Sequence, residues 1–382
     1  MIYLDHNAST PVRPEVCEAV AAALAEHHAN PSSLHRDGQK ARAAIERARA
    51  QVATLLGAAS DDVVFVSGGT EGDHEALIGA AWALESRGRR VAVSSLEHHA
   101  VHGAADVLVR LGFAIEHLPA SPAGFVIPGA VDALPADTTV ISLMLANNET
   151  GVIQPVAEVC TRAAARGMRV HCDAVQAAGK VPIDMRALGA DYVVISAHKL
   201  GGPKGVGALV RRPGAPLEPL LRGSGHEGHL RAGTENLSGI VGFGLAAELS
   251  ARDLVAERTR LMALRSRFEA GLRAAVPDIV IHGASAPRLP NTVNASFPGA
   301  RSDHLLMALD ARGVAVSAGA ACSSGAVAPS PVLIAMGVAI DLATCALRFS
   351  FGHTTTADEI ERALECVSAS VPAARAAAGL LS

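Results

Sequence analysis

Residues 193–209 read VVISAHKLGGPKGVGAL, and they place Lys199 between two apolar runs. The first run predicts a buried strand, and a glycine-rich turn separates it from the second run. Lys199 therefore lies at the end of a strand. A lysine in this position is costly to bury as a cation, so it must find a partner, reach solvent, or be used covalently as an amine. Taken alone, a solvated loop lysine is the ordinary interpretation.

A second polar cluster, HCDAVQ at 171–176, ends another apolar stretch upstream. Its acid, Asp173, lies 26 residues before Lys199 (199 − 173). An acid and a lysine at two strand ends, joined by a crossover, are what a pyridoxal phosphate site requires. The lysine forms the Schiff base and the acid faces the pyridinium nitrogen. The two strand ends together predict such a site.

The composition predicts a large globular enzyme. Of the 382 residues, 49% are hydrophobic and 18% charged, and single cores stop growing near about 250 to 300 residues, so two domains are expected. A net charge of −4 and 3% aromatic residues offer no surface for nucleic acid. The six cysteines form no CxxC pair, so the sequence suggests neither a disulfide framework nor a zinc ribbon. Without a secretory pattern or a membrane-length apolar run, we expect a cytoplasmic protein.

Strands alternate with helices along the first part of the chain, and polar clusters recur where strands end. These clusters are SGGTEG (67–72), EHHAV (97–101) and NNETG (147–151). The glycines of the first cluster, ahead of a helix, predict an anion cradle, although an ordinary strand-to-helix turn has the same appearance. The alternation predicts an α/β fold with a largely parallel, doubly wound sheet and one site beyond the carboxyl ends of its strands.

The rest of the chain predicts a smaller α+β domain. A glycine-rich loop at 222–236 precedes an amphipathic helix that we expect to start at about residue 251. Strands are expected around 291–297, 314–316 and 346–351. We therefore assign residues 15–250 to a large domain, and residues 1–14 with 251–382 to a small one.

Cys322 lies in a run of small residues, SAGAACSSG at 317–325, within the smaller domain. A free cysteine is usually a buried hydrophobic residue. We apply that interpretation to Cys17, Cys160, Cys345 and Cys366. The small neighbours of Cys322 cannot bury it well, and a thiol on an exposed loop could act as a nucleophile. No base stands beside it in the sequence to activate the thiol.

The ordered motifs of the chain resemble those of the cysteine desulfurases, a branch of the class V aminotransferase-like pyridoxal phosphate enzymes of fold type I. The matching motifs are YLDHNASTP, NPSSLHRDG, SGGTEGDH, EHHAV, NNETG, HCDAVQAAGKVPID, SAHKLGGPKGVGAL, RAGTEN, SAGAACSSG and LRFSFG. They follow the family's order over essentially the full length, which is far more specific than any one glycine motif. The resemblance implies the fold-type I transferase architecture, with a large doubly wound domain and a smaller α+β domain.

The resemblance also implies roles for particular residues. Lys199 would bind the cofactor covalently and move protons at the substrate Cα, and Cys322 would attack the substrate sulfur. The other implied cofactor contacts are Asp173 at the pyridine nitrogen, Gln176 at the phenolate oxygen, His98 on the ring face, Gly69, Thr70, Ser196 and His198 at the phosphate, and Thr234 from a neighbouring subunit. Asn148 would border the cofactor and, with Arg348, bind the substrate carboxylate.

The implied reaction converts L-cysteine to L-alanine and leaves a persulfide on Cys322. A sulfur-acceptor protein, either an iron–sulfur scaffold or a carrier for tRNA thiolation, would take the sulfur. A homodimer is implied, and no metal, nucleic acid or membrane is expected. The chain departs from the family at His74, at 226–229 (HEGH) and at His353, where Asn, QERG and Arg are usual. Because of these departures, the sequence does not identify the sulfur acceptor or the surface that binds it.

Other functions remain as alternatives. A selenocysteine lyase or another class V aminotransferase would make Cys322 incidental, and an inactive sulfur-assembly subunit would not need the lysine, acid and thiol together. A dinucleotide-dependent dehydrogenase lacks its GxGxxG signature. Two sets of histidines have metal-like spacing: His98, His99 and His102, and His226 with His229. No carboxylate or thiol completes either set.

Overall fold

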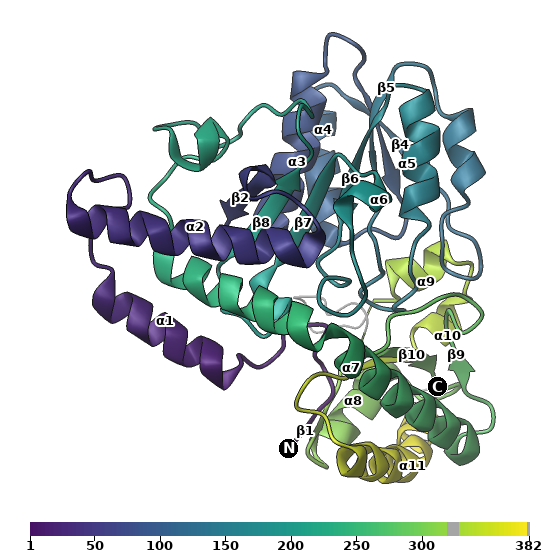
Figure 1. Cartoon of the computed structure of the whole chain (residues 1–382). Helices are drawn as coiled ribbons and strands as arrows, with labels where there is room; N and C mark the ends of the chain where they lie inside the picture. The colour runs from purple at the N-terminus through teal and green to yellow at the C-terminus, as the bar shows by residue number, and fades with distance from the viewer. Residues whose placement is uncertain (319–327, 380–382) are drawn as a thin grey trace.

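The computed structural model describes residues 1–318 and 328–379 (Figure 1). Its largest sheet has seven strands in the order β2-β8-β7-β6-β5-β3-β4. The strands are β2 Val63–Val66, β3 Arg90–Ser94, β4 Ala114–Leu118, β5 Thr138–Ser142, β6 Arg169–Asp173, β7 Tyr192–Ser196 and β8 Gly207–Arg211. β8 is antiparallel to both neighbours, and the other pairs are parallel. The predicted α/β fold with a largely parallel sheet is confirmed.

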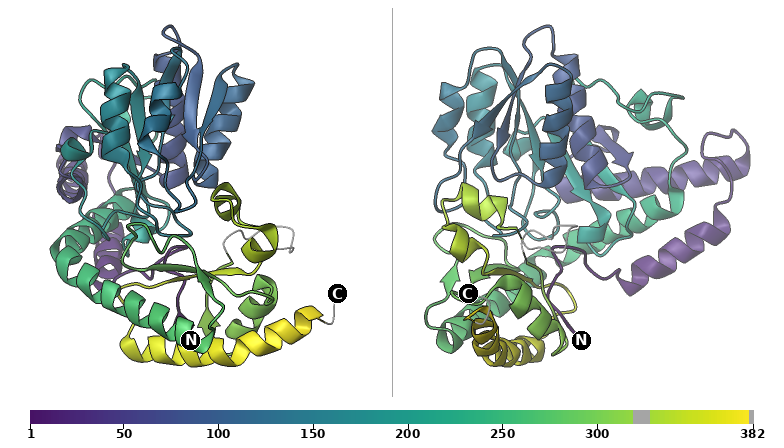
Figure 2. Two further views of the ribbon diagram at one scale, coloured as in Figure 1. Left: turned by 90° about the vertical axis from the view of Figure 1, so that its right-hand side faces the viewer. Right: turned by 180° about the vertical axis from the view of Figure 1, so that it is seen from behind.

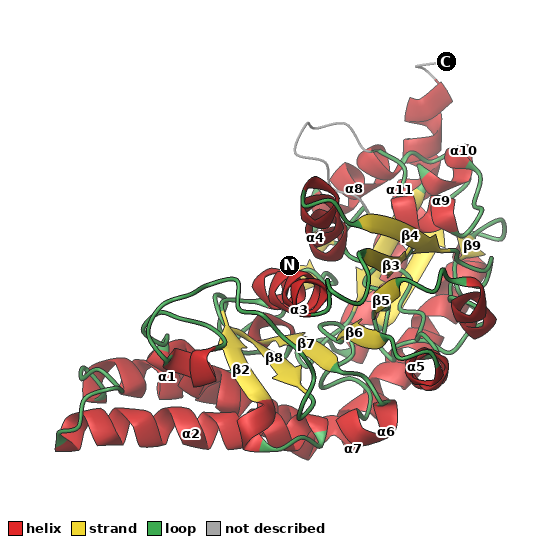
Figure 3. Ribbon diagram, turned by 90° about the horizontal axis from the view of Figure 1, so that it is seen from above, coloured by secondary structure: helices red, strands yellow, loops and turns green. Residues whose placement is uncertain are grey.

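Helices cover both faces of this sheet, as the view from above shows (Figure 3). One face packs against α3 (Gly69–Ala83) and α4 (His99–Arg110). The other packs against α2 (Arg36–Leu56), α5 (Val156–Ala165) and the first half of α7 (Leu237–Ala275). Strands buried on both faces need continuous apolar runs, which is why the runs in β2 and β7 do not alternate with polar residues.

A second apolar cluster lies around two smaller sheets. The C-terminal part of the chain, coloured green to yellow, forms the lower part of the molecule in both views of Figure 2. One sheet is antiparallel with the order β12-β10-β9, and the other pairs β1 with β11 in parallel. These strands are β1 Ile2–Tyr3, β9 Val280–Ile281, β10 Thr292–Ser296, β11 Val314–Ala315 and β12 Ala346–Ser350. The accompanying helices are α8 Ser302–Asp310, α9 Pro331–Ala335, α10 Ile340–Ala343 and α11 Ala357–Gly379. The N-terminal strand thus pairs with the C-terminal part of the chain.

Helix α7 joins the two clusters. It begins at Leu237, where the Asn236 side chain accepts a hydrogen bond from the Gly239 N–H at 3.2 Å, so the predicted start near residue 251 is wrong. Asn caps of this kind satisfy N–H groups that the first helical turn leaves free. Phe243 is buried in the main cluster and Phe268 in the second, so one continuous helix enters both. The predicted domain boundary falls inside this helix and stays a prediction.

The two remaining helices, α1 (Pro14–Glu26) and α6 (Met185–Leu188), lie near the surface, and α1 buries only Val16 and Ala23. Cys17 is exposed on α1, so its interpretation as a buried residue is wrong; Cys160 and Cys345 are buried as predicted. No helix in the described part of the chain is long and apolar enough to cross a membrane.

A buried ion pair closes the free edge of the large sheet at β2. Glu227 accepts two hydrogen bonds from the Arg49 guanidinium, at 2.7 and 2.8 Å, and a third from the Phe65 N–H at 2.7 Å. Arg49 also donates to the Val63 carbonyl at 2.8 Å. The pair therefore satisfies backbone groups that an edge strand would leave open. It also fixes the loop at 222–236, because Glu227 holds a positive φ of 47° within that loop.

Removing the Glu227 carboxylate should destabilise the fold strongly. Glu227→Ala keeps the backbone strain but removes the buried carboxylate that binds two of the Arg49 nitrogens. It leaves Arg49 only its contact with the partly exposed Glu46 at 3.1 Å, a change that lowers the free energy of unfolding by about 3 kcal/mol. Glu218→Ala is the control, because its pair with Arg222 is exposed and such pairs contribute about 0 to 1 kcal/mol. Urea unfolding followed by circular dichroism measures both. Equal losses in the two variants would contradict the assigned role.

Candidate active site

One cavity of about 320 Å³ gathers most of the predicted site residues. It lies where β6 and β7 end and α3 and α4 begin, which is the edge that the strand-end clusters predict. The predicted residues that line it are Gly69, Thr70, His98, Asn148, Asp173, Gln176, Ser196, His198 and Lys199. The ends of separate strands and helices thus meet around one space.

Lys199 ends a short 3-10 helix, Ala197–Lys199, that directly follows β7. Its Nζ donates to two main-chain carbonyls of the N-terminal arm, Asn7 at 2.5 Å and Ala8 at 2.9 Å. Burial lowers its pKa to about 8, with a further lowering from Arg348. A neutral amine is therefore accessible near physiological pH, as a covalent role for a lysine requires.

Asp173 ends β6 and is fully buried beside the same cavity. One of its carboxylate oxygens accepts from the Val175 N–H at 2.8 Å. Burial raises the pKa of Asp173, whereas the Val175 N–H and Lys199 act in the opposite direction. A positively charged group placed in the cavity beside this carboxyl would stabilise its ionised form.

The beginning of α3 forms a cradle with open backbone. A side chain at Gly68 would meet no atom within 4 Å, whereas a Cβ at Gly69 would come within 3.0 Å of Val175. The first N–H groups of a helix have no intrahelical partner and lie at the positive end of its dipole. Ser196 and His198 approach from β7, and His198 hydrogen-bonds to Ser9 at 3.3 Å. This set can hold an anion.

His98 is the N-cap of α4. Its Nδ1 accepts a hydrogen bond from the Ala100 N–H at 3.2 Å, so the proton of the neutral ring sits on Nε2. Burial lowers the pKa of His98 to about 4, with a further lowering from Lys199. The ring is therefore neutral and fixed in one tautomer. A neutral aromatic face on the cavity wall suits stacking against a planar ligand.

Arg348, on β12, lies beside Asn148, which lines the cavity. It donates to Asp5 at 2.7 Å and to the Asn148 carbonyl at 3.0 Å, and its buried Nε has no hydrogen-bond partner among residues 1–318 and 328–379. Asn7 connects to the same point, because its side-chain NH2 donates to the Asn148 carbonyl at 3.2 Å. A guanidinium beside Asn148 fits the expected binding of a carboxylate.

Two predicted residues, Arg348 and Thr234, do not line this cavity. Thr234 lines a separate pocket of about 150 Å³, together with Ser67 and Asn236. The prediction for Thr234 concerned a neighbouring subunit, so this position neither supports nor excludes it. Cys322 lies outside the described residues.

Some cavity residues were missed by the sequence analysis. Asn7 and Ala8 belong to a polar arm whose sequence marks it as a turn, but nothing in it indicates contact with Lys199, 192 positions away. Asp73 lines the cavity, and its Oδ1 lies 3.3 Å from Nε2 of the fully buried His171. Burial raises the pKa of Asp73 and lowers that of His171 to about 3. The sequence carries no signal for this pair beyond an acid following a glycine turn.

Comparison with known proteins identifies the family. A profile of the "Aminotransferase class-V" family matches residues 2–363. The chain belongs to the class-V aminotransferase family. Cysteine desulfurase IscS of Dictyoglomus turgidum is 44% identical to this class-V chain over 365 residues, covering 95% of the chain and 93% of that protein.

Two solved structures show the same architecture as this class-V chain. A NifS-like protein matches with a TM-score of 0.90 and 35% identity, over 96% of this chain and 98% of that one. A structure named SspA in complex with cysteine matches with a TM-score of 0.82 and 30% identity, over 92% and 99%. The predicted fold-type I architecture is confirmed by these matches. In residues 1–318 and 328–379, no group of three or more His, Cys, Asp or Glu side chains could hold a metal ion.

The reactivity of Lys199 should follow its lowered pKa. In the protein without added ligand, acylation of its amine should show a midpoint near pH 8, because burial and Arg348 disfavour the ammonium form. Arg348→Met removes a nearby cation and should move the midpoint to higher pH. Lys204→Ala removes an exposed lysine and should leave it unchanged. Peptide mapping after brief labelling measures the pH midpoint of Lys199 acylation. A midpoint near that of a free lysine, about 10.4, would refute the lowered pKa of Lys199.

Proposed function

We propose that the protein is a pyridoxal phosphate-dependent cysteine desulfurase that forms L-alanine and a persulfide on Cys322. The observation that carries the proposal is the cavity that joins Lys199 and Asp173 to the anion cradle of α3. The family membership, and relatives named cysteine desulfurase over nearly the whole chain, support the same function. No observation favours a second candidate function.

The side chains of the cavity fit pyridoxal phosphate. Lys199 offers an amine with a pKa near 8 for the covalent link, and Asp173 offers a buried carboxyl for a protonated ring nitrogen. The residues we assign to the phosphate are Gly69, Thr70, Ser196 and His198. His98 would lie against the ring and Gln176 near its phenolate oxygen. When bound, the cofactor supplies an electron sink for charge that develops on the substrate.

The residues of the chain divide the remaining tasks. Arg348 and Asn148 bind and orient the α-carboxylate of cysteine, since a guanidinium pairs with carboxylates in a fixed geometry. Lys199 holds and moves a proton at the substrate Cα, which its lowered pKa permits. His98 is fixed by its cap bond to α4, so the neutral ring keeps one wall of the cavity in place.

The sulfur step is assigned to Cys322 from the SAGAACSSG motif. Its thiolate attacks the substrate sulfur, the new S–S bond forms, and the substrate Cβ–S bond breaks. In sum, cysteine and the Cys322 thiol give alanine and a Cys322 persulfide, so that atoms balance. A sulfur-acceptor protein then takes the outer sulfur. We propose a cytoplasmic location, because a reducing compartment keeps a free thiol from being lost to a disulfide.

We also propose a homodimer in which Thr234 serves the cofactor phosphate of the partner. The support is geometric: Thr234 lies in a pocket apart from its own cavity, on a loop anchored to β2 by Glu227 and to α3 by Arg231. The Arg231 guanidinium donates to Glu71 at 2.7 Å. A loop held at two points presents the same surface in each copy, as a two-fold symmetric contact requires.

Loss of the thiol should stop sulfur removal but leave the cofactor site working. Cys322→Ser should still bind pyridoxal phosphate and change the visible spectrum on addition of cysteine, because Lys199 and Asp173 are unchanged. Alanine formation should fall to background, since a hydroxyl cannot form a persulfide. Mass spectrometry of the wild type after cysteine, without reductant, should show one added sulfur on the Cys322 peptide. Wild-type turnover by Cys322→Ser, or sulfur on Cys172, would refute the assignment, and activity confined to selenocysteine would favour the lyase.

Mixing two inactive variants tests the shared site. In a mixed dimer of Lys199→Ala and Thr234→Ala chains, a site with Lys199 from one chain and Thr234 from the other is complete. Random exchange should therefore restore about a quarter of the sites to full activity. Lys199→Ala chains mixed with one another serve as the control and should restore none. A fully active monomer, or no recovery after confirmed exchange of subunits, would rule out the trans arrangement.

A further inference from the structure

Lys180 is a buried cation outside the set of residues discussed so far. Only 9% of it is exposed, and its Nζ donates two hydrogen bonds, both to Gln176: one to the main-chain carbonyl at 2.9 Å and one to Oε1 at 3.0 Å. Among the ion pairs of residues 1–318 and 328–379, Lys180 has none. Burying an ammonium without a carboxylate is unfavourable. A lysine that only supported the fold could be replaced by an apolar residue, so its position suggests another task.

Lys180 is one end of a continuous hydrogen-bonded chain that leads to Lys199. Gln176 accepts from Lys180 through Oε1 and donates through Nε2 to the Asn7 carbonyl at 2.9 Å. The same carbonyl accepts from Lys199 at 2.5 Å. A carbonyl can only accept and an ammonium can only donate, so both ends of the amide are fixed. Gln176 therefore presents an N–H, and not a carbonyl oxygen, to the cofactor cavity.

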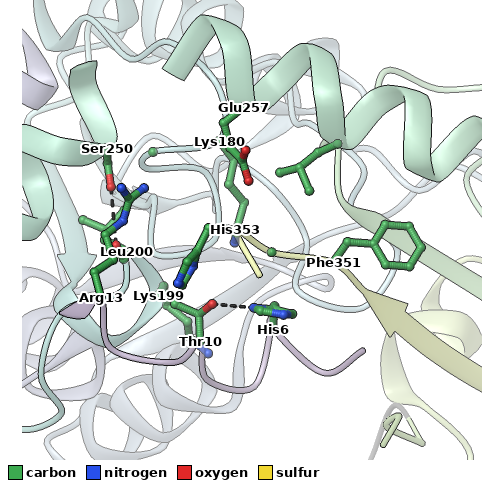
Figure 4. Close-up of a pocket in the computed structure, with 13 residues that line it drawn as sticks. His6, Thr10, Arg13, Lys180, Lys199, Leu200, Ser250, Glu257, Phe351 and His353 are labelled. Carbon is green, nitrogen blue, oxygen red and sulfur yellow. Dashed lines mark hydrogen bonds between the residues drawn. The ribbon is translucent and has the colours of Figure 1, made fainter. Parts of the chain in front are cut away.

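A small pocket of about 50 Å³ lies behind Lys199 (Figure 4). Lys180 and Lys199 both line it, and Lys199 lines the cofactor cavity as well. The other titratable side chains that line this pocket are His6, Arg13, Glu257 and His353. The two lysines are thus close neighbours with only a narrow polar space beside them.

The charged groups around Lys180 do not neutralise it. Glu257 is paired with Arg260 at 2.7 Å, and Arg13 is paired with Asp253 at 2.8 Å. Burial lowers the pKa of Lys180 to about 7, with further lowering from Lys199 and Arg348. Burial also lowers the pKa of His6 to about 3 and that of His353 below its ordinary value, so both rings are neutral at pH 7. Beyond burial, Lys180 contributes to the lowered pKa of His6 in the small pocket and of His198 in the cofactor cavity, so its charge acts on both spaces.

We propose that Lys180 is a positioning residue of the active site, which fixes Gln176 so that its Nε2 faces the cofactor cavity and places a second positive charge behind Lys199. The hydrogen bonds of Lys180 and Gln176 are observed in the structure and do not depend on the proposed function. The identity of the ligand that Gln176 contacts rests on the proposed function. A donor with a cation behind it stabilises a negatively charged oxygen in the cavity and disfavours protonation there. Groups that titrate in the cavity should therefore lose their protons at lower pH than they would without Lys180.

The test uses the protein loaded with pyridoxal phosphate and the variant Lys180→Met. The pH midpoint of the change in visible absorption should rise by roughly one pH unit, because removing a nearby cation makes protonation easier. Lys40→Met is the matched control, since Lys40 is exposed and pairs with Asp37 on α2. Lys180→Arg, which keeps the charge, should restore most of the wild-type midpoint. A purely structural lysine would change the thermal midpoint but not this titration.

A second measurement separates this proposal from the proposed function. In protein without added cofactor, Lys199 should be acylated more slowly in Lys180→Met than in the wild type below pH 7, where the wild-type Lys180 still carries its charge. If the wild type showed no absorption band with pyridoxal phosphate, the proposed function would fail, and this measurement would still decide the role of Lys180. If Lys180→Met does not fold, Lys180→Gln replaces it, because glutamine is neutral and can still donate to Oε1 of Gln176. The same two measurements and the same expected changes apply to Lys180→Gln. A folded neutral variant with the absorption midpoint and the Lys199 acylation rate below pH 7 both unchanged overturns the proposal.

Discussion

Two main-chain carbonyls of the N-terminal arm, those of Asn7 and Ala8, hold the Lys199 amine inside the protein. Carbonyl oxygens accept from an ammonium and from a neutral amine alike, so the contact survives a change in protonation. Burial lowers the pKa of Lys199 to about 8, and this partial desolvation makes the amine usable as a base or nucleophile. The reactive lysine therefore depends on the N-terminal arm, 192 positions earlier in the sequence.

The arm reaches this point because it is tied to the C-terminal part of the chain. β1 pairs with β11, Asp5 forms a bridge to Ser350, and the Asn7 side chain donates to Thr292 at 2.9 Å. Arg348 completes the connection through its contact with Asp5. The cavity is thus built from the end of the large sheet on one side and from a strand anchored to the small sheets on the other. Changes in how the two apolar clusters pack would move Asn7 relative to Lys199.

The parts of the site that follow strands could be predicted from the sequence, and the rest could not. An apolar run with a glycine turn defines a strand end locally, so Asp173 and Lys199 could be placed at one edge of a parallel sheet. The bonds from Asn7 to Lys199 and from Arg49 to Glu227 join distant positions, and no local pattern encodes them. The helix start at 237 was missed because its first half is apolar on several sides and lacks a clear amphipathic period.

Burial shifts the charged groups around the cavity toward their neutral forms. The pKa values of Lys180 and Lys199 are lowered, and those of Asp73, Glu97 and Asp173 are raised. Lys199 and Arg348 further lower the pKa of Lys180, whereas Asp173 further raises the pKa of both Asp73 and Glu97, so charges of one sign are gathered together. In the protein alone, the acids therefore keep their protons to higher pH and the lysines lose theirs at lower pH than in water. A ligand with an anionic end and a cationic ring atom would supply counter-charges to both, so electrostatics favours a ligand with separated charges over one of a single sign.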